Sequence, residues 1–114
     1  MSKESVKDFF DRYKRSTGKM MHDLPNMMKG FKGLFDNIMH NSALDLKTKE
    51  LIALAIGLAV RCEPCIYLHT QKCLDAGATR EEILEAASVT VMMQGGPSFT
   101  HIPAVIEALD ALEK

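Results

Sequence analysis

The chain has 114 residues, of which 46% are hydrophobic and 25% charged, the ordinary composition of one soluble globular domain spanning residues 1–114. Its formal net charge of −1 offers no basic surface for nucleic acid. The longest apolar run, Leu51 to Val60, is far shorter than the roughly 20 residues that span a bilayer, and the polar N-terminus has no signal-peptide core, so we predict a cytoplasmic protein without membrane contact.

The first part of the chain predicts two helices. Residues 2–17 place apolar side chains on one face and basic side chains on the other, and Gly18 is expected to end this helix. Pro25 is suited to the first position of a second helix, in which apolar residues continue at helical spacing as far as Met39.

A third helix is predicted over about residues 46–61, with Asp45 as its N-cap. Its middle, Leu51 to Val60, is apolar on all faces, which is typical of a helix buried on every side. We expect this to be the central helix, with part of its cover supplied by another subunit.

Three further helices are expected. The fourth begins at a Cys-Glu-Pro-Cys motif and ends near Ala76-Gly77, so that residues 46–77 form a helical hairpin. Thr79-Arg-Glu-Glu82 has the capping-box pattern that starts a fifth helix. Pro97 permits a last helix, whose start Pro103 can shift. With no strand pattern, the fold class is all-α, a compact bundle of about six helices.

Reactive side chains are concentrated in residues 62–69, at the start of the fourth helix. Cys65 falls in the first helical turn, where free N–H groups and the helix dipole stabilise a thiolate. His69 follows one turn later on the same face and can exchange a proton with it. Cys62 precedes Cys65 by three residues, a spacing from which a small adjustment closes a disulfide. The pair can therefore cycle between dithiol and disulfide.

The third cysteine is expected to be a packed core thiol. Cys73 lies about 12 Å along the same helix from Cys65, too far to form a bridge with it or to share one zinc ion with it. A three-ligand zinc site from Cys62, Cys65 and His69 is left open by the spacing. Covalent attachment of haem is excluded, because Ile66 rather than histidine follows the second cysteine.

Glu50 can be placed by helix arithmetic. If the third and fourth helices form an antiparallel hairpin that turns near residue 62, Glu50 lies about 18 Å from the turn, His69 about 10 Å and Cys65 about 5 Å. Glu50 is then nearer to His69 than to Cys65, which orders a relay as Glu50, His69, Cys65. The alternative is a solvated carboxylate in the first turn of a helix.

The pattern Glu50-x11-Cys62-x2-Cys65-x3-His69 resembles the motif of alkylhydroperoxidase D-like proteins in the carboxymuconolactone decarboxylase family. The resemblance covers about residues 25–112. It implies an all-helical fold assembled as trimers, dimers or hexamers, and a peroxidase cycle without a bound cofactor or metal. In that cycle Cys65 attacks a hydroperoxide, Cys62 closes the disulfide and meets an external dithiol or disulfide reductase, and Glu50 with His69 relays protons.

The chain departs from the best-known members of that family. They often carry a histidine where this chain has Pro64, and they are longer, with a second helical repeat. Carboxymuconolactone decarboxylases proper generally lack the cysteine pair, so its presence argues against that reaction. The rival hypotheses are a protein disulfide reductase or redox sensor, a lyase that uses His69 and Glu50 as acid and base, and a non-enzymatic module with zinc at the cysteines.

Overall fold

A computed structural model describes residues 4–113, which form helices α1 to α7 and, in this part of the chain, no strand. Six of these helices have eleven residues or more and the seventh, α6, is a single turn, so the predicted all-α fold with about six helices is confirmed. The described chain divides into two compact units, one up to His40 and one from Asn41.

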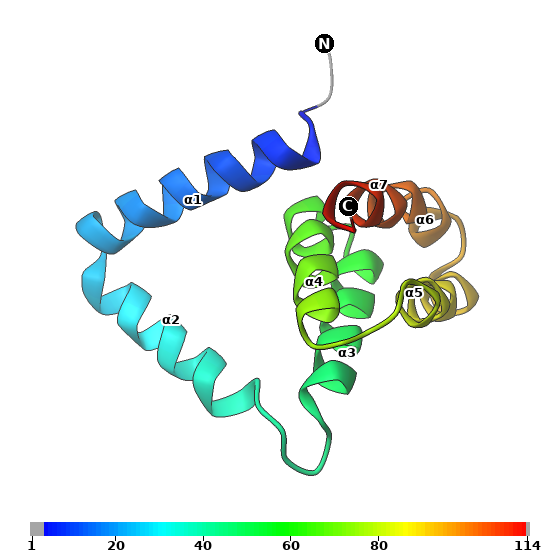
Figure 1. The fold of residues 1–114 in the computed structure, drawn as a ribbon, viewed down its shortest axis with the longest axis horizontal. Coiled ribbons are helices and arrows are strands. Elements are labelled where there is room, and N and C mark those ends of the chain that lie inside the picture. Colours follow the sequence, from blue (N-terminus) through cyan, green and yellow to red (C-terminus); the bar gives the residue numbers. More distant parts are fainter. Residues whose placement is uncertain (1–3, 114) are drawn as a thin grey trace. The chain divides into compact units, whose positions relative to one another are not determined.

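The first unit consists of α1 (Val6–Asp23) and α2 (Pro25–Ile38). The two helices meet at a sharp angle in Figure 1, separated only by Leu24. Ser5 caps α1 by accepting the N–H of Asp8 at 3.0 Å. Within α1, the ring of Phe9 stacks on Tyr13, with ring centroids 5.6 Å apart.

The predicted end of the first helix at Gly18 is wrong, because α1 continues to Asp23. A glycine inside a helix costs only about 1 kcal/mol relative to alanine, which the flanking turns can offset. Leu24 precedes Pro25, and a residue before proline disfavours the helical conformation, so the proline ends α1. Of the predicted range 2–17, residues 2 and 3 lie outside the described residues.

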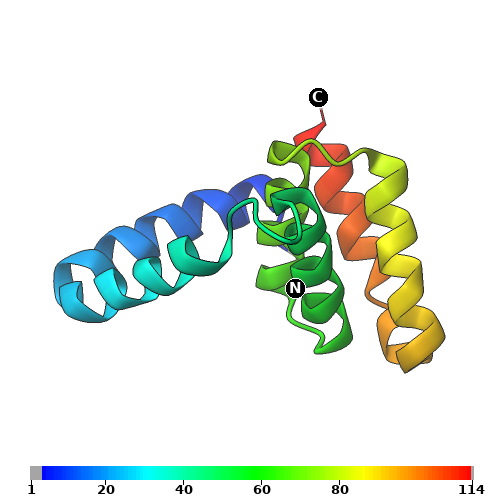
Figure 2. The same cartoon turned by 90° about the horizontal axis from the view of Figure 1, so that it is seen from below.

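The second unit is built on the hairpin of α3 (Leu46–Ala59) and α4 (Glu63–Asp75), which lie side by side in Figure 1 and Figure 2. Helix α5 (Arg80–Gln94) packs against α3, and α7 (Ile102–Leu112) packs against α4. The core between them is aliphatic, and six of its side chains have no exposed surface: Leu54, Leu58, Ile66, Ile83, Val105 and Leu109.

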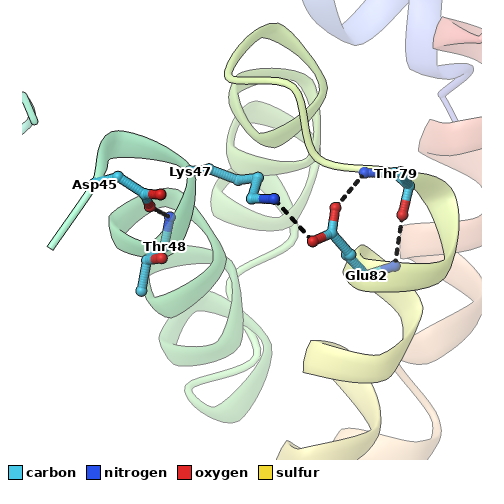
Figure 3. Close-up of polar contacts among 5 residues, drawn as sticks. All are labelled: Asp45, Lys47, Thr48, Thr79 and Glu82. Carbon is cyan, nitrogen blue, oxygen red and sulfur yellow. Dashed lines mark hydrogen bonds and ion pairs between the residues drawn. The ribbon is translucent and has the colours of Figure 1, made fainter.

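The predicted caps of α3 and α5 are confirmed, and Figure 3 shows both. Asp45 accepts the N–H of Thr48 at 2.8 Å. Thr79 and Glu82 form the expected capping box, in which each side chain accepts the other residue's backbone N–H. Lys47 joins the starts of the two helices by donating to Glu82 at 2.9 Å, and the hydrogen bond from Lys47 lowers the pKa of Glu82.

The last predicted helix is divided in two. Pro97 lies in α6 (Gly96–Phe99), and α7 starts afresh at Ile102, with Pro103 in its first turn, as its position allowed. The break follows from Pro103, because it cannot donate the N–H that a helix continuous with α6 would need at that position.

Helix α3 is not buried on every side within one chain, contrary to its apolar sequence. Leu54 and Leu58 are fully buried, but Ile52, Ile56 and Val60, at intervals of four residues, have 45%, 58% and 62% of their surface exposed. These three residues form one stripe along the helix, called here the α3 stripe. In the described part of the chain, no helix is both long and apolar enough to cross a membrane.

Candidate redox site at the α3–α4 hairpin

A Schellman motif at the end of α3 places Cys62 at the start of α4. The N–H of Cys62 donates to the carbonyl of Gly57 at 2.9 Å, and the N–H of Arg61 donates to the carbonyl of Leu58 at 3.1 Å. These two bonds define a Schellman helix end, whose penultimate residue adopts the left-handed conformation. Here that residue is Arg61, with φ of 59°. The next residue, Cys62, is therefore already the N-cap of α4.

Cys62 and Cys65 form a disulfide across the first turn of α4, with their Cα atoms 5.2 Å apart. Cys62 Sγ also accepts the backbone N–H of Cys65 at 3.3 Å. Pro64 lies between them in the first turn, where its missing N–H leaves no helix hydrogen bond unmade. The predicted bridge between the two thiols is thus present in the structure.

The capping role differs from the sequence expectation in one respect. Cys65 lies in the first turn as predicted, but the sulfur that receives a backbone hydrogen bond belongs to Cys62, because Cys62 is the N-cap. A capping sulfur gains stability as an anion from the N–H that it accepts. Any advantage of Cys65 as the reactive thiolate must therefore come from the helix dipole and from His69, four residues along its own face.

His69 is held by Glu50 from the neighbouring helix. The imidazole Nδ1 and Glu50 Oε1 are 2.7 Å apart, with only 16% of the histidine side chain and 6% of the glutamate side chain exposed. A carboxylate only accepts, so Nδ1 carries the proton and Nε2 of a neutral imidazole is left to accept. The proximity predicted from helix rise is observed, and the solvated alternative for Glu50 is wrong. The catalytic roles of all four residues stay predictions.

Cys73 is free and has no exposed surface. Burial, with a smaller contribution from the negative charge of Glu50, raises the pKa of its thiol to about 12. A thiol of that pKa is protonated at neutral pH and is not nucleophilic. This agrees with the packed core thiol expected from its place on the helix.

Among residues 4–113, no group of three or more histidine, cysteine, aspartate or glutamate side chains is arranged to hold a metal ion. The disulfide itself uses two of the sulfurs that the zinc hypothesis would need.

Sequence reasoning missed Gly57, which touches both cysteines. Its carbonyl accepts the N–H of Cys62, and a Cβ built on it would lie 2.9 Å from the Cβ of Cys65. The available signal was a single glycine inside an otherwise apolar helical run, a pattern that marks a close approach of two backbones.

Comparison with known proteins then identifies the family. The family model described as "Carboxymuconolactone decarboxylase family" matches residues 25–110. The chain belongs to this family. A solved structure of a family member from Legionella pneumophila, described as an apo form, superposes with a TM-score of 0.91 at 36% identity, covering 96% of this chain and 97% of the other.

Two relatives show how far the family assignment reaches. A Cupriavidus necator protein whose name assigns it no function is 31% identical over 98 residues, which are 86% of this chain and 87% of that protein. Alkyl hydroperoxide reductase AhpD of Corynebacterium kroppenstedtii is 33% identical over 72 residues, 63% of this chain but only 41% of AhpD. This member of the carboxymuconolactone decarboxylase family therefore spans less than half of its named enzymatic relative.

Proposed function

We propose that the chain is a thiol-dependent peroxidase that reduces hydroperoxides through Cys62 and Cys65. The observation that carries this proposal is the buried contact between Glu50 and His69, on the hairpin that also holds the cysteine disulfide. A cysteine that only packs needs no oriented imidazole on its own helix face. The partial match to an alkyl hydroperoxide reductase supports the same reaction class.

The first half of the cycle consumes the peroxide. The Cys65 thiolate attacks the terminal oxygen of the hydroperoxide, the O–O bond breaks, and Cys65 becomes a sulfenic acid. The departing alkoxide takes a proton and leaves as the alcohol. In this cycle His69 Nε2 first takes the proton of the Cys65 thiol and then returns it to the alkoxide, while Glu50 holds the Nδ1 proton and so keeps the ring in one orientation and tautomer.

The second half restores the thiols. The Cys62 thiolate attacks the sulfenic sulfur, the disulfide forms, and the hydroxide released leaves as water after protonation. An external dithiol then exchanges with the disulfide and becomes oxidised, so the two electrons taken by the peroxide come from that dithiol. We propose cytoplasmic action, because thiols are kept reduced there.

The deciding experiment measures peroxide consumption with dithiothreitol as reductant. Cys65→Ser is expected to abolish turnover, and Cys73→Ser to retain activity as the matched control. Cys62→Ser, given peroxide after the dithiothreitol has been removed, is expected to stop at a sulfenic acid after one turnover. Full turnover by Cys65→Ser would contradict the proposal. Rapid exchange with protein disulfides without peroxide turnover would favour a disulfide reductase, and lactone decarboxylation that survives loss of both Cys62 and Cys65 would favour a lyase.

We also propose that the chain assembles with copies of itself, as dimers, trimers or hexamers. The α3 stripe, Ile52, Ile56 and Val60, supports this, because it is an exposed row of large apolar side chains on the helix whose opposite face forms the core. Light scattering after size exclusion tests it. Wild type is expected to elute as an oligomer, and Ile56→Glu to shift it to the monomer while leaving the helical circular dichroism unchanged. A monomeric wild type at micromolar concentration would contradict this proposal.

A further inference from the structure

Gly57 is a point of close approach between α3 and the redox pair. It is a buried residue of α3, and a Cβ added to it would meet the Cβ of Cys65 at 2.9 Å and the carbonyl carbon of Cys65 at 3.6 Å. The first of these distances is shorter than any that real Cβ atoms adopt, so a side chain here would force α3 and α4 apart. The atom in the way is the root of the Cys65 side chain, which cannot rotate aside.

The same residue also fixes the other cysteine. The carbonyl of Gly57 accepts the N–H of Cys62 at 2.9 Å, as the longer bond of the Schellman end of α3. One residue of α3 thus fixes the backbone of Cys62 by a hydrogen bond and the Cβ of Cys65 by close contact. The disulfide joins the two positions that Gly57 sets.

Gly57 also lies on the same face of α3 as Glu50. The two residues are seven apart, which is two helical turns. On α4, Cys65 and His69 are four apart and likewise share a face. The hairpin therefore carries two cross-helix contacts along one line: Gly57 against Cys65, and Glu50 with His69 at 2.7 Å. Moving Cys65 away from α3 would change its place relative to the anchored imidazole.

We propose that Gly57 is a positioning residue for the redox pair, and that its lack of a side chain stabilises the disulfide state of Cys62 and Cys65. In the oxidised protein the disulfide joins both cysteines, Cys62 bonded through its N–H to the Gly57 carbonyl and Cys65 with its Cβ in the space that a side chain at position 57 would need. In the reduced protein the first turn of α4 is free of the S–S bond and can relax around an added methyl group. A side chain at position 57 therefore costs the oxidised state more than the reduced state.

The test compares Gly57→Ala with wild type in glutathione redox buffers of known poise. We expect the disulfide of the variant to be easier to reduce, with a change of about tenfold in the equilibrium constant, which corresponds to roughly 30 mV for this two-electron couple. Gly30→Ala is the matched control, since it adds the same methyl group to α2, where nothing lies within 4 Å. That control is expected to leave the potential unchanged.

The inference rests on the redox pair of the proposed function but not on peroxide as its substrate. The potential is measured without peroxide, so a protein that lacks peroxidase turnover can still show the shift, and an active peroxidase can still fail to show it. A folded Gly57→Ala variant with the potential of wild type overturns the inference, even if its melting temperature falls, because the glycine then serves packing alone.

A second variant keeps the test decisive if Gly57→Ala does not fold. In the double variant Gly57→Ala with Cys65→Gly, the Cβ that the alanine would meet is absent. Recovery of helical circular dichroism in the double variant supports the assigned contact. A double variant that stays unfolded, while Cys65→Gly alone folds, shows that the alanine clashes elsewhere and overturns the inference.

Discussion

The turn that precedes α4 and the turn that follows it share one set of backbone hydrogen bonds but differ in their side chains. The turn between α3 and α4 is called the first turn here, and the turn between α4 and α5 the second turn. In the first turn the N–H of Cys62 donates to the Gly57 carbonyl and the N–H of Arg61 to the Leu58 carbonyl. In the second turn, four other residues repeat them at the same intervals, with donor–acceptor distances of 2.9 and 3.0 Å: Ala78 to Cys73, and Gly77 to Leu74. Both are Schellman helix ends.

The second turn has the residues that stability favours. Gly77 takes the left-handed position, with φ of 92°, at no steric cost, and Thr79 follows as a strong oxygen cap for α5. The first turn instead has Arg61 in the left-handed position and a sulfur cap from Cys62. A non-glycine residue there costs roughly 1–2 kcal/mol. The site of the proposed chemistry is thus the less stable of two similar structures, as is usual where function constrains the sequence.

The largest effect is expected at the buried pair of Glu50 and His69, which joins the helices on either side of the first turn. His69→Ala leaves the Glu50 carboxylate buried without its partner, which should lower the free energy of unfolding by about 3 kcal/mol. Urea unfolding at neutral pH measures this. His22→Ala is the control, because that imidazole and its partner Asp23 are exposed, and it should leave stability unchanged. Equal effects of the two substitutions would show that Glu50 does not depend on His69.

Substitutions at the two left-handed positions, Gly77 and Arg61, are expected to change the free energy of unfolding in opposite directions. Gly77→Ala should lower the free energy of unfolding by about 1–2 kcal/mol, since alanine is strained at φ of 92° wherever it is placed. Arg61→Gly should raise it by about 0.5 kcal/mol, the relief of strain being partly offset by the greater freedom of glycine in the unfolded chain. Thermal unfolding of both variants tests the pair of signs. A loss of stability in Arg61→Gly would mean that its side chain, not its backbone, matters there.

The caps predict a smaller contrast. Thr79→Ala removes the acceptor for the Glu82 N–H and should cost about 1 kcal/mol. Cys62→Ser, compared with wild type under reducing conditions, replaces a weak sulfur acceptor with a hydroxyl and should raise stability by about 0.5 kcal/mol. Chemical unfolding with a reductant present measures both. The contrast between the turns would lose its basis if the serine variant were the less stable protein.

What could be predicted from sequence is local or follows from simple helix arithmetic. The caps at Asp45 and Thr79 are confirmed because a cap is decided by residues within three positions of it. The approach of Glu50 to His69 is confirmed because rise per residue places Glu50 nearer to His69 than to Cys65 along the hairpin. The family resemblance from four spaced residues is confirmed by the match over residues 25–110.

What could not be predicted depends on contacts between helices or on unusual backbone. Arginine is not a residue that sequence reasoning assigns to a left-handed position, so Arg61 gave no signal. Gly57 mattered only once α4 was placed against it. Gly18 was expected to end the first helix, whereas the helix continues to Asp23 and is ended by Pro25. The extent of burial of α3 depends on neighbours that its own apolar residues do not specify.

The smallest effect at neutral pH, and the one that depends most on conditions, concerns Cys73 at the head of the second turn. Its ordinary thiol pKa of 9.0 rises to about 12 in the folded protein, chiefly by burial. Below pH 9 the thiol is protonated in both states and contributes no pH dependence. Between pH 9 and 12 the unfolded chain loses this proton and the folded chain keeps it, so the stability that it contributes falls as pH rises.

Urea unfolding from pH 8 to 11 measures that slope, in a background where Cys62 and Cys65 are both serine so that no disulfide can reshuffle. Relative to this background, the variant that also carries Cys73→Ala should show a free energy of unfolding that declines less steeply above pH 9, with the decline beginning at the same pH. The comparison cancels the other groups that titrate at alkaline pH, since both proteins share them. Parallel declines would mean that the thiol ionises as readily in the folded chain as in the unfolded one. Cys73 would then be accessible to solvent in the folded chain.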